Sequence, residues 1–157
     1  MIREFMSSDL PAAENIWNDV VKEGNAFPQD EILTDDALSF FQSQSYTGIA
    51  VRDGEIVGLY ILHPNNVGRC SHIANASYAV ASSMRGMRIG EELVKDSLQV
   101  AKKLGFRILQ FNAVVKSNEK AHKLYRKLGF TPLGTIPGGF RHDDGSYENI
   151  IPYFIEL

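Results

Sequence analysis

The sequence lacks the features that mark secreted and membrane-spanning proteins. It contains a single cysteine, Cys70, which cannot form an internal disulfide bond and therefore agrees with a reducing compartment. No apolar run approaches the roughly 18 residues that a membrane-spanning helix requires. The N-terminal residues, MIREFM, have no apolar signal region. We therefore expect a cytoplasmic protein that has no membrane partner.

The sequence also lacks a concentration of basic residues. Its 16 lysine and arginine residues are scattered among 19 aspartate and glutamate residues, which gives a net charge of -3. No basic stripe with interleaved aromatic residues occurs, and this argues against nucleic acid as a partner. A chain of 157 residues with 44% hydrophobic and 22% charged residues is typical of one soluble domain. We expect residues 1–157 to form a single domain around one core.

Apolar spacing and turn residues predict an α/β protein with a mixed sheet and helices on both of its faces. Strands are expected at residues 1–6, 46–52, 55–63, 72–80, 107–115, 131–136 and 149–156, with a loop at 138–147. Helices are expected after Ser8 or Asp9, after Thr34, at residues 87–104 and at residues 118–128. Asp53-Gly54 is typical of a type I′ hairpin turn. The crossover across residues 71–115 predicts one parallel strand pair.

Residues 78–93, YAVASSMRGMRIGEEL, end a strand and open a helix through a basic turn that contains glycines. The free N–H groups of a helix's first turn point outward at the positive end of its dipole. Glycines let a ligand approach the backbone, and arginines add positive charge, so the turn predicts a site for a phosphate-bearing ligand. The alternative is a turn with a purely steric role. Neither G-x-x-x-x-G-K-[ST] nor G-x-G-x-x-G is present.

Two segments resemble motifs of the GCN5-related N-acetyltransferases. The acetyl-CoA loop of that family reads Q/R-x-x-G-x-G/A; Arg85, Ile89 and Gly90 fit it, whereas Arg88 stands at the position of the first glycine. Residues 118–130, NEKAHKLYRKLGF, are similar to the family's N-x-x-A-x-x-L-Y-x-x-x-G-F helix. The resemblance covers nearly the whole chain. It implies an acetyl-CoA-dependent N-acetyltransferase whose mostly antiparallel sheet contains a splayed parallel strand pair, and a homodimer is a family-level expectation.

The resemblance also implies where acetyl-CoA, the co-substrate, binds. Its pantetheine arm would lie between the splayed strands at residues 71–81 and 107–115 and pair with their exposed backbone groups. Glu91 and Glu92 are expected to face solvent. Asn118 is expected to reach the cofactor, to cap its own helix, or to do both. The full set of implied cofactor contacts is Tyr78, Ala79, Val80, Arg85, Gly86, Met87, Arg88, Ile89, Gly90, Glu91, Asn118 and Tyr125.

Tyr125 is the candidate general acid. From its spacing with Ala121, Leu124 and Leu128 alone, it belongs to the apolar stripe of a core-facing helix. Its place in the second motif instead implies that it protonates the departing thiolate during direct transfer, with both substrates bound together. A phenol has an ordinary pKa of about 10 and is therefore protonated at neutral pH.

The general base is left open by the sequence. His63, His72 and His122 are each more typical of structural or surface histidines than of catalytic bases. Two alternatives need no basic side chain: a water molecule accepts the proton, or the amine is already neutral when it binds. Residues 142–144, His-Asp-Asp, are expected to form a solvated turn at the border of the acceptor site, and three adjacent polar residues do not make a metal site.

Asn75 and Asn112 are the candidate acceptor-binding residues. An asparagine inside a strand of small and apolar residues is unfavourable unless its amide has a partner. Either the pair holds the carboxylate or amino group of a small acceptor, or each amide bonds to neighbouring backbone. Residues 60–80 also resemble the matching part of fungal acetyltransferases that act on proline analogues such as azetidine-2-carboxylate, in which matching asparagines contact the substrate.

The expected acceptor is therefore the amine of a small molecule, with an amino acid or an analogue as the candidates. Two alternatives stay open. The acceptor is instead a protein N-terminus or a lysine, or the chain is a non-catalytic acyl-CoA-binding regulatory domain. No acidic run that would mark a site for basic peptides is present.

Overall fold

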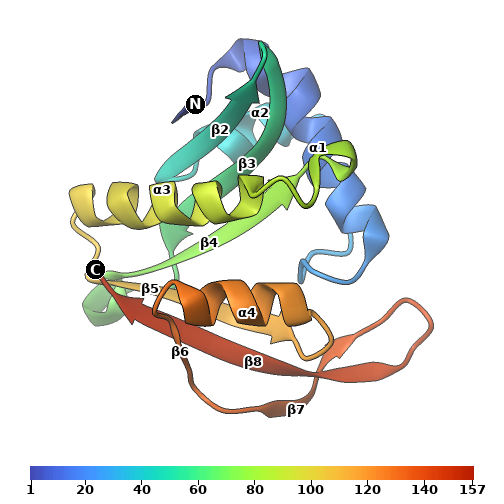
Figure 1. The fold of residues 1–157 in the computed structure, drawn as a ribbon, viewed down its shortest axis with the longest axis vertical. Coiled ribbons are helices and arrows are strands. Elements are labelled where there is room, and N and C mark those ends of the chain that lie inside the picture. Colours follow the sequence, from blue (N-terminus) through green and yellow to red (C-terminus); the bar gives the residue numbers. More distant parts are fainter.

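Eight strands and four helices make up the computed structural model, which describes residues 1–157 (Figure 1). Their order is the predicted order with one strand added near the C-terminus. None of the helices has both the length and the apolar character needed to cross a bilayer. The elements are β1 (Ile2–Glu4), α1 (Leu10–Glu23), α2 (Ala37–Gln42), β2 (Tyr46–Arg52), β3 (Glu55–Pro64), β4 (Ile73–Val80), α3 (Ile89–Lys103), β5 (Ile108–Val115), α4 (Glu119–Lys127), β6 (Thr131–Pro132), β7 (Ile136–Arg141) and β8 (Tyr147–Glu156).

All strands belong to one sheet, in the order β1-β2-β3-β4-β5-β8-β6, with β7 also paired to β8. Every pair is antiparallel except β4 and β5, which are parallel. That parallel pair is short, because only Ile73 with Ile108 and Ala74 with Leu109 are in register. Beyond these residues the two strands diverge, as Figure 1 shows. The predicted fold class, with its splayed parallel pair, is confirmed.

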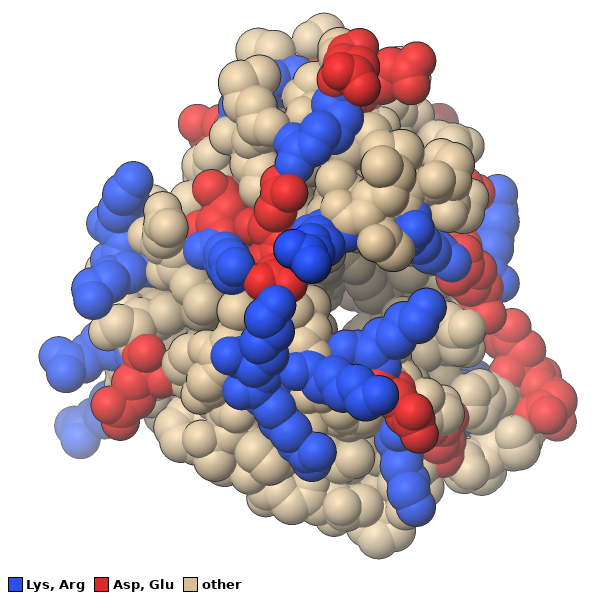
Figure 2. All heavy atoms as spheres, in the orientation of Figure 1, with Lys and Arg blue, Asp and Glu red and all other residues tan.

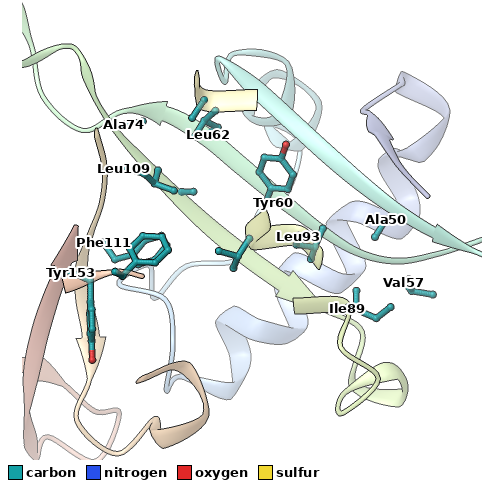
Figure 3. Close-up of a cluster of buried hydrophobic side chains, with 14 residues drawn as sticks. Ala50, Val57, Tyr60, Leu62, Ala74, Ile89, Leu93, Leu109, Phe111 and Tyr153 are labelled. Carbon is teal, nitrogen blue, oxygen red and sulfur yellow. The ribbon is translucent and has the colours of Figure 1, made fainter. Parts of the chain in front are cut away.

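Helices cover both faces of the sheet. One face carries α3 and α4, and there Leu93 of α3 belongs to the larger core cluster together with Leu109 of β5 and Tyr153 of β8 (Figure 3). The other face carries α1 and α2, whose Trp17 and Phe41 pack with residues of β2, β3 and β4. The sheet is therefore buried on both faces at its centre. The gap between β4 and β5 lies between the layer of α3 and α4 and the layer of α1 and α2.

The predicted hairpin turn is confirmed by its backbone conformation. Asp53 has a φ of 51° and Gly54 a φ of 82°, and a type I′ turn requires positive φ at both positions. The resulting register of β2 against β3 places Tyr60 in the buried centre of the sheet. The second helix begins at Ala37, with Asp36 and not Thr34 at its N-cap position.

The prediction for residues 131–147 was wrong in two respects. The expected strand at 131–136 is only two residues long, and β7 occupies the beginning of the expected loop. In the sequence, the Gly138-Gly139 pair is typical of a loop. A Cβ atom at Gly139 would lie 2.5 Å from Ile150 on β8, so this glycine permits close strand packing in a hairpin.

Candidate active site

A cavity of about 180 Å³ lies where β4 and β5 part. Its walls come from both strands, from the start of α4 and from residues 26–28 of the loop after α1. Ten of its fifteen lining residues are hydrophobic, so polar groups inside it are few and well defined. Apolar pockets with a few convergent polar groups are typical of ligand sites.

The edge of β4 offers unpaired backbone groups to this cavity. Ala81 N–H donates to Val57 O of β3 at 2.9 Å, whereas His72 O faces the other way and accepts from Arg107 N–H at 3.0 Å. Because backbone groups alternate in direction along a strand, those of Tyr78 and Val80 face the gap beside β5. Ala79, by contrast, pairs with Leu59 and is 1% exposed, so the structure does not bring this predicted contact to the cavity.

Tyr125 lies both in the apolar core and in the wall of the central cavity. Its ring packs against Phe111, with the ring centroids 4.4 Å apart, and against Phe130 and Tyr153. It also lines the cavity, and its hydroxyl group has no hydrogen-bond partner in the chain. Burial raises the pKa of the Tyr125 phenol above its ordinary value, and nearby Tyr153 adds to the effect. The hydroxyl is therefore protonated at neutral pH and free to donate into the cavity.

The turn before α3 has the backbone of an anion cradle. Gly86 and Arg88 have φ values of 84° and 63°, and this left-handed bend turns the chain into the helix. The N–H groups of residues 88–91 donate to no other group of the chain, and the first bonded amide of the helix is that of Glu92, to Arg88 O at 3.1 Å. A Cβ atom at Gly90 would meet nothing within 4 Å, so the space over these amides is open. Met87 lies in the turn itself, where its amide bonds weakly to Met84 O at 3.4 Å.

Charged side chains surround this cradle, and Figure 2 shows blue side chains gathered around a hollow in the middle of this face. Arg85 pairs with Glu23 of α1 at 2.6 Å. Glu91 was expected to face solvent, but its side chain is only 16% exposed and pairs with Lys127 at 2.8 Å and Lys95 at 2.7 Å. These hydrogen bonds lower the pKa of Glu91 to about 2. The two lysines therefore neutralise the carboxylate of Glu91 in the first turn of α3.

A second cavity, of about 430 Å³, extends from the edge of β4 to Arg85. It shares Tyr78, Val115 and Asn118 with the central cavity, so the two are adjacent. The Oδ1 atom of Asn118 accepts a hydrogen bond from Ala121 N–H at 3.2 Å and caps α4. Asn118 thus has the predicted capping role and also lines both cavities.

A third cavity, of about 380 Å³, lies on the other side of the central one. It is bounded by the end of α1, the loop that follows, and the hairpin of β7 and β8, and it shares Phe27 and Pro28 with the central cavity. Unlike the central cavity it is mostly polar. Its charged and titratable lining residues are Lys22, Asp30, Arg141, His142 and Asp143.

Asn75 and Asn112 both line the central cavity, but neither contacts the other. The Nδ2 group of Asn75 donates to Gln110 O at 2.8 Å. Asn112 donates to Asn65 Oδ1 at 2.6 Å and accepts from Gln110 Nε2 at 3.0 Å. Asn75 is thus bonded to backbone, as one of the two interpretations required, whereas both partners of Asn112 are side chains. The Oδ1 atom of Asn75 keeps an unused acceptor position beside the cavity.

The histidines fall into separate environments. His122 is buried, its Nε2 donates to Val115 O at 2.9 Å, and its Nδ1 accepts from the Tyr153 hydroxyl at 2.6 Å, so this side chain is structural. His63 and His72 line none of the three cavities. His142 was expected in a solvated turn, yet it is half-buried and bonded to Glu148 Oε1 at 2.9 Å. Sequence reasoning missed this pair because it forms across the hairpin that was not predicted.

Comparison with known proteins gives consistent matches. Residues 10–130, well over half of the chain, match the model of the Acetyltransferase (GNAT) family. The chain is 38% identical over 81 residues to N-acetyltransferase aca1 of Schizosaccharomyces pombe; the alignment covers 52% of this chain and 39% of that protein, so the chain spans less than half of that relative. A GCN5-related N-acetyltransferase from Kribbella flavida is 35% identical and superposes with a TM-score of 0.91, covering 100% of this chain and 97% of that one.

A second solved structure shares the fold at lower identity. It is a GNAT superfamily phosphinothricin acetyltransferase from Sinorhizobium meliloti in complex with AcCoA. This protein is 18% identical to the present chain and superposes with a TM-score of 0.91, covering 100% of this chain and 88% of that one.

Proposed function

Because the chain belongs to the acetyltransferase (GNAT) family, we propose that it transfers an acetyl group from acetyl-CoA to the amine of a small molecule. Transfer is direct, with both substrates bound together, and needs no acylated side chain. A cytoplasmic location and a homodimer stay predictions. The proposal concerns this chain alone, since it spans only part of its relative from Schizosaccharomyces pombe.

One observation carries the proposal: the three cavities follow one another, with Tyr125 at the central one. On one side, the path leads past the unpaired edge of β4 to Arg85, which precedes the free amides of residues 88–91 in the same turn. On the other side, it leads to a polar cavity that is open to a second molecule. A two-substrate reaction needs this arrangement, because the acyl donor and the acceptor must reach one point from different directions.

The side of the path that leads to Arg85 suits the successive parts of acetyl-CoA, from the pyrophosphate through the pantetheine arm to the thioester. The pyrophosphate would accept hydrogen bonds from the amides of residues 88–91, near the guanidinium group of Arg85. The pantetheine arm would pair with the backbone of Tyr78 and Val80, as an added strand does. The N–H groups on the same edge would stabilise the oxyanion that forms at the thioester carbonyl.

Tyr125 would then serve as the general acid. The C–N bond forms as the C–S bond breaks, and the departing thiolate takes the phenolic proton, which the hydroxyl recovers afterwards. Its unpartnered hydroxyl and its raised pKa suit a donor that must stay protonated until the thiolate forms. No acceptor in the chain competes with the thiolate for the phenolic proton.

The acceptor side favours a small molecule that carries charges of both signs. The third cavity has carboxylates at Asp30 and Asp143 and cationic groups at Lys22 and Arg141. A cavity of about 380 Å³ accommodates an amino acid or an analogue, and the charges match its ammonium and carboxylate groups. Asn75 adds its free Oδ1 atom as an acceptor at the central cavity. Proline analogues such as azetidine-2-carboxylate are the first acceptors to test.

The test is the release of free thiol from acetyl-CoA in the presence of an acceptor panel. The panel contains amino acids, proline analogues including azetidine-2-carboxylate, phosphinothricin, polyamines, aminoglycosides and short peptides. We expect release with the amino acids or their analogues and none with a buffer blank. Release with peptides alone would instead indicate a protein acceptor. Binding of acetyl-CoA by calorimetry without release from any acceptor would identify a non-catalytic binding domain and contradict the proposal.

A further inference from the structure

His142 and Glu148 form an oriented pair in the wall of the polar cavity. His142 opens the turn between β7 and β8, where its N–H donates to Ser146 O at 2.8 Å. Its Nε2 atom lies 2.9 Å from Glu148 Oε1, and because a carboxylate only accepts hydrogen bonds, Nε2 carries the proton. In the neutral imidazole the Nδ1 atom is therefore a free acceptor, and no group of the chain bonds to it.

Glu148 is itself fixed by a second contact. Its Oε2 atom accepts a hydrogen bond from Ser117 N–H at 2.6 Å, one residue before the cap of α4. Hydrogen bonding by Ser117, from its side chain first and then from this N–H group, lowers the pKa of the Glu148 carboxyl, so Glu148 is ionised at neutral pH. The carboxylate thus joins the hairpin of β7 and β8 to the helix that carries Tyr125.

The position of His142 is suited to the acceptor. It lines the polar cavity together with Ala113, which also lines the central cavity beside Tyr125. The other histidines are excluded, because His122 has both ring nitrogens occupied and His63 and His72 line none of the cavities. The charged groups around His142 are Lys22 of α1, Asp30 of the loop, Arg141, Asp143 and Asp144 of the hairpin, and Glu148 of β8.

We propose that His142 is the general base of the acetyl transfer inferred above, and that Glu148 is the positioning residue that fixes its tautomer. An acceptor ammonium loses one proton to Nδ1 of His142, and the neutral amine then attacks the thioester carbonyl. The nitrogen loses two protons in the whole reaction: one ends on the thiol of coenzyme A, and the other leaves through the imidazole to solvent. The imidazole thus returns to its neutral form, and no other reactant is needed.

The test compares the pH dependence of kcat/KM in the wild type and in His142→Gln. Acetyl-CoA is used with azetidine-2-carboxylate, or with whichever amine of the panel above releases thiol. Near neutral pH we expect a loss of about 10²-fold to 10³-fold in kcat/KM, with an unchanged Kd for acetyl-CoA. The loss should narrow as the pH rises, because the amine then loses its proton without a base. His72→Gln is the matched control, since His72 is exposed and lies outside the cavities.

Glu148→Gln gives a second measurement that a purely structural role would not produce. An amide has only one acceptor oxygen, so with Ser117 N–H bonded to it, the –NH₂ group faces His142 Nε2 and reverses the tautomer. Nδ1 of His142 then already carries a proton and cannot take one from the ammonium group of the acceptor. We expect Glu148→Gln to share the pH profile of His142→Gln while its melting temperature stays within a few degrees of wild type.

The outcomes separate this inference from the proposed function. An active wild type whose His142→Gln variant has the same kcat/KM and pH profile overturns the role of His142 alone. A wild type that binds acetyl-CoA and releases no thiol overturns the acetyl transfer and the role of His142 together. Loss of activity in His142→Gln at every pH, with wild-type melting and acetyl-CoA binding, also contradicts a base role, because a free amine at high pH needs no base.

Discussion

The side-chain amide of Asn75 donates to the main-chain carbonyl of Gln110 at 2.8 Å, one residue beyond the last paired residues of β4 and β5. A side chain thus takes the place of the next rung of the strand ladder. Because the side chain of Asn75 reaches farther from the backbone than a peptide N–H does, it bonds to the Gln110 carbonyl while the two strands stay apart. The opening of the central cavity therefore begins at this hydrogen bond.

Asn75→Ala should lower the free energy of unfolding by about 1 kcal/mol, since Gln110 O loses its partner. Urea denaturation measures the change. Asn66→Ala is the matched control, because the side chain of Asn66 is exposed and bonds only to the adjacent Val67 N–H. Equal stability of the two variants would contradict a role for Asn75 in holding the strand gap.

Tyr125→Phe should lower kcat on the order of 10²-fold and leave the Kd of acetyl-CoA unchanged, because the phenolic proton is needed only as the thiolate departs. Stability should change by less than about 0.5 kcal/mol, since the hydroxyl has no partner in the chain. Steady-state kinetics with Tyr147→Phe, an exposed tyrosine, as the control checks this. Unchanged kcat would remove Tyr125 from the acid role.

Arg88→Gly should raise the free energy of unfolding by about 1 kcal/mol. Arg88 has a φ of 63°, a conformation that a side chain disfavours and glycine adopts without strain. Arg88→Ala keeps the strain and removes the guanidinium group, so it separates backbone strain from lost charge. Thermal denaturation of the three proteins measures the difference; a more stable Ala variant than Gly variant would contradict the strain.

Gly90→Ala should separate stability from cofactor binding. Nothing in the chain lies within 4 Å of the added Cβ atom, and alanine favours the helix, so unfolding should cost about 0.5 kcal/mol more. The loop motif that Gly90 fits accepts either glycine or alanine at this position, so we expect the Kd for acetyl-CoA to stay within about twofold of the wild type. Calorimetry and thermal denaturation of the same variant check both effects, and an affinity weakened 10-fold or more would contradict the fit of Gly90 to the loop motif.

Asp9→Asn should destabilise the protein by about 2 kcal/mol at pH 7. Asp9 accepts bonds from Arg3 at 2.7 and 2.8 Å, and these bonds are the main cause of its lowered pKa. A lowered carboxyl pKa gives stability that is full above the ordinary value near 4 and is lost as the pH falls through the folded-state pKa. The difference between wild type and variant should therefore shrink below pH about 4. Asp35→Asn, an exposed carboxylate, should show no such trend.

Local patterns predicted most of the fold because the decisive interactions are close in sequence. The Asp53-Gly54 turn, for example, is set by two adjacent residues. The family predicted from the loop at residues 85–90 and the helix at 118–130 is confirmed by the family match over residues 10–130. Gly138-Gly139 misled the prediction, because a glycine that permits strand packing and one that permits a turn look alike in sequence.

The candidate site was harder to predict where it depends on pairing across the fold. Glu91 looks like an ordinary first-turn carboxylate, and only the packing of α4 beside α3 brings Lys127 to it. His142 and Glu148 face each other because of the register of β7 with β8, which no local pattern fixes. The free amides of α3, by contrast, follow from the helix start itself and were predicted.

The loop after α1 is held at two buried residues, Phe27 and Leu33. The ring of Phe27 packs against Trp17 with the ring centroids 4.4 Å apart. The side chain of Asn18 donates to Leu33 O and accepts from Leu33 N–H. The residues between these anchors are all exposed, and Pro28, Gln29 and Asp30 line the polar cavity. Exposed positions of this kind tolerate replacement with little effect on folding. Over evolutionary time, descendants of this chain are therefore free to exchange one acceptor for another by substitutions confined to residues 28–32, while the sheet, the anchors and the acyl-donor side are inherited unchanged.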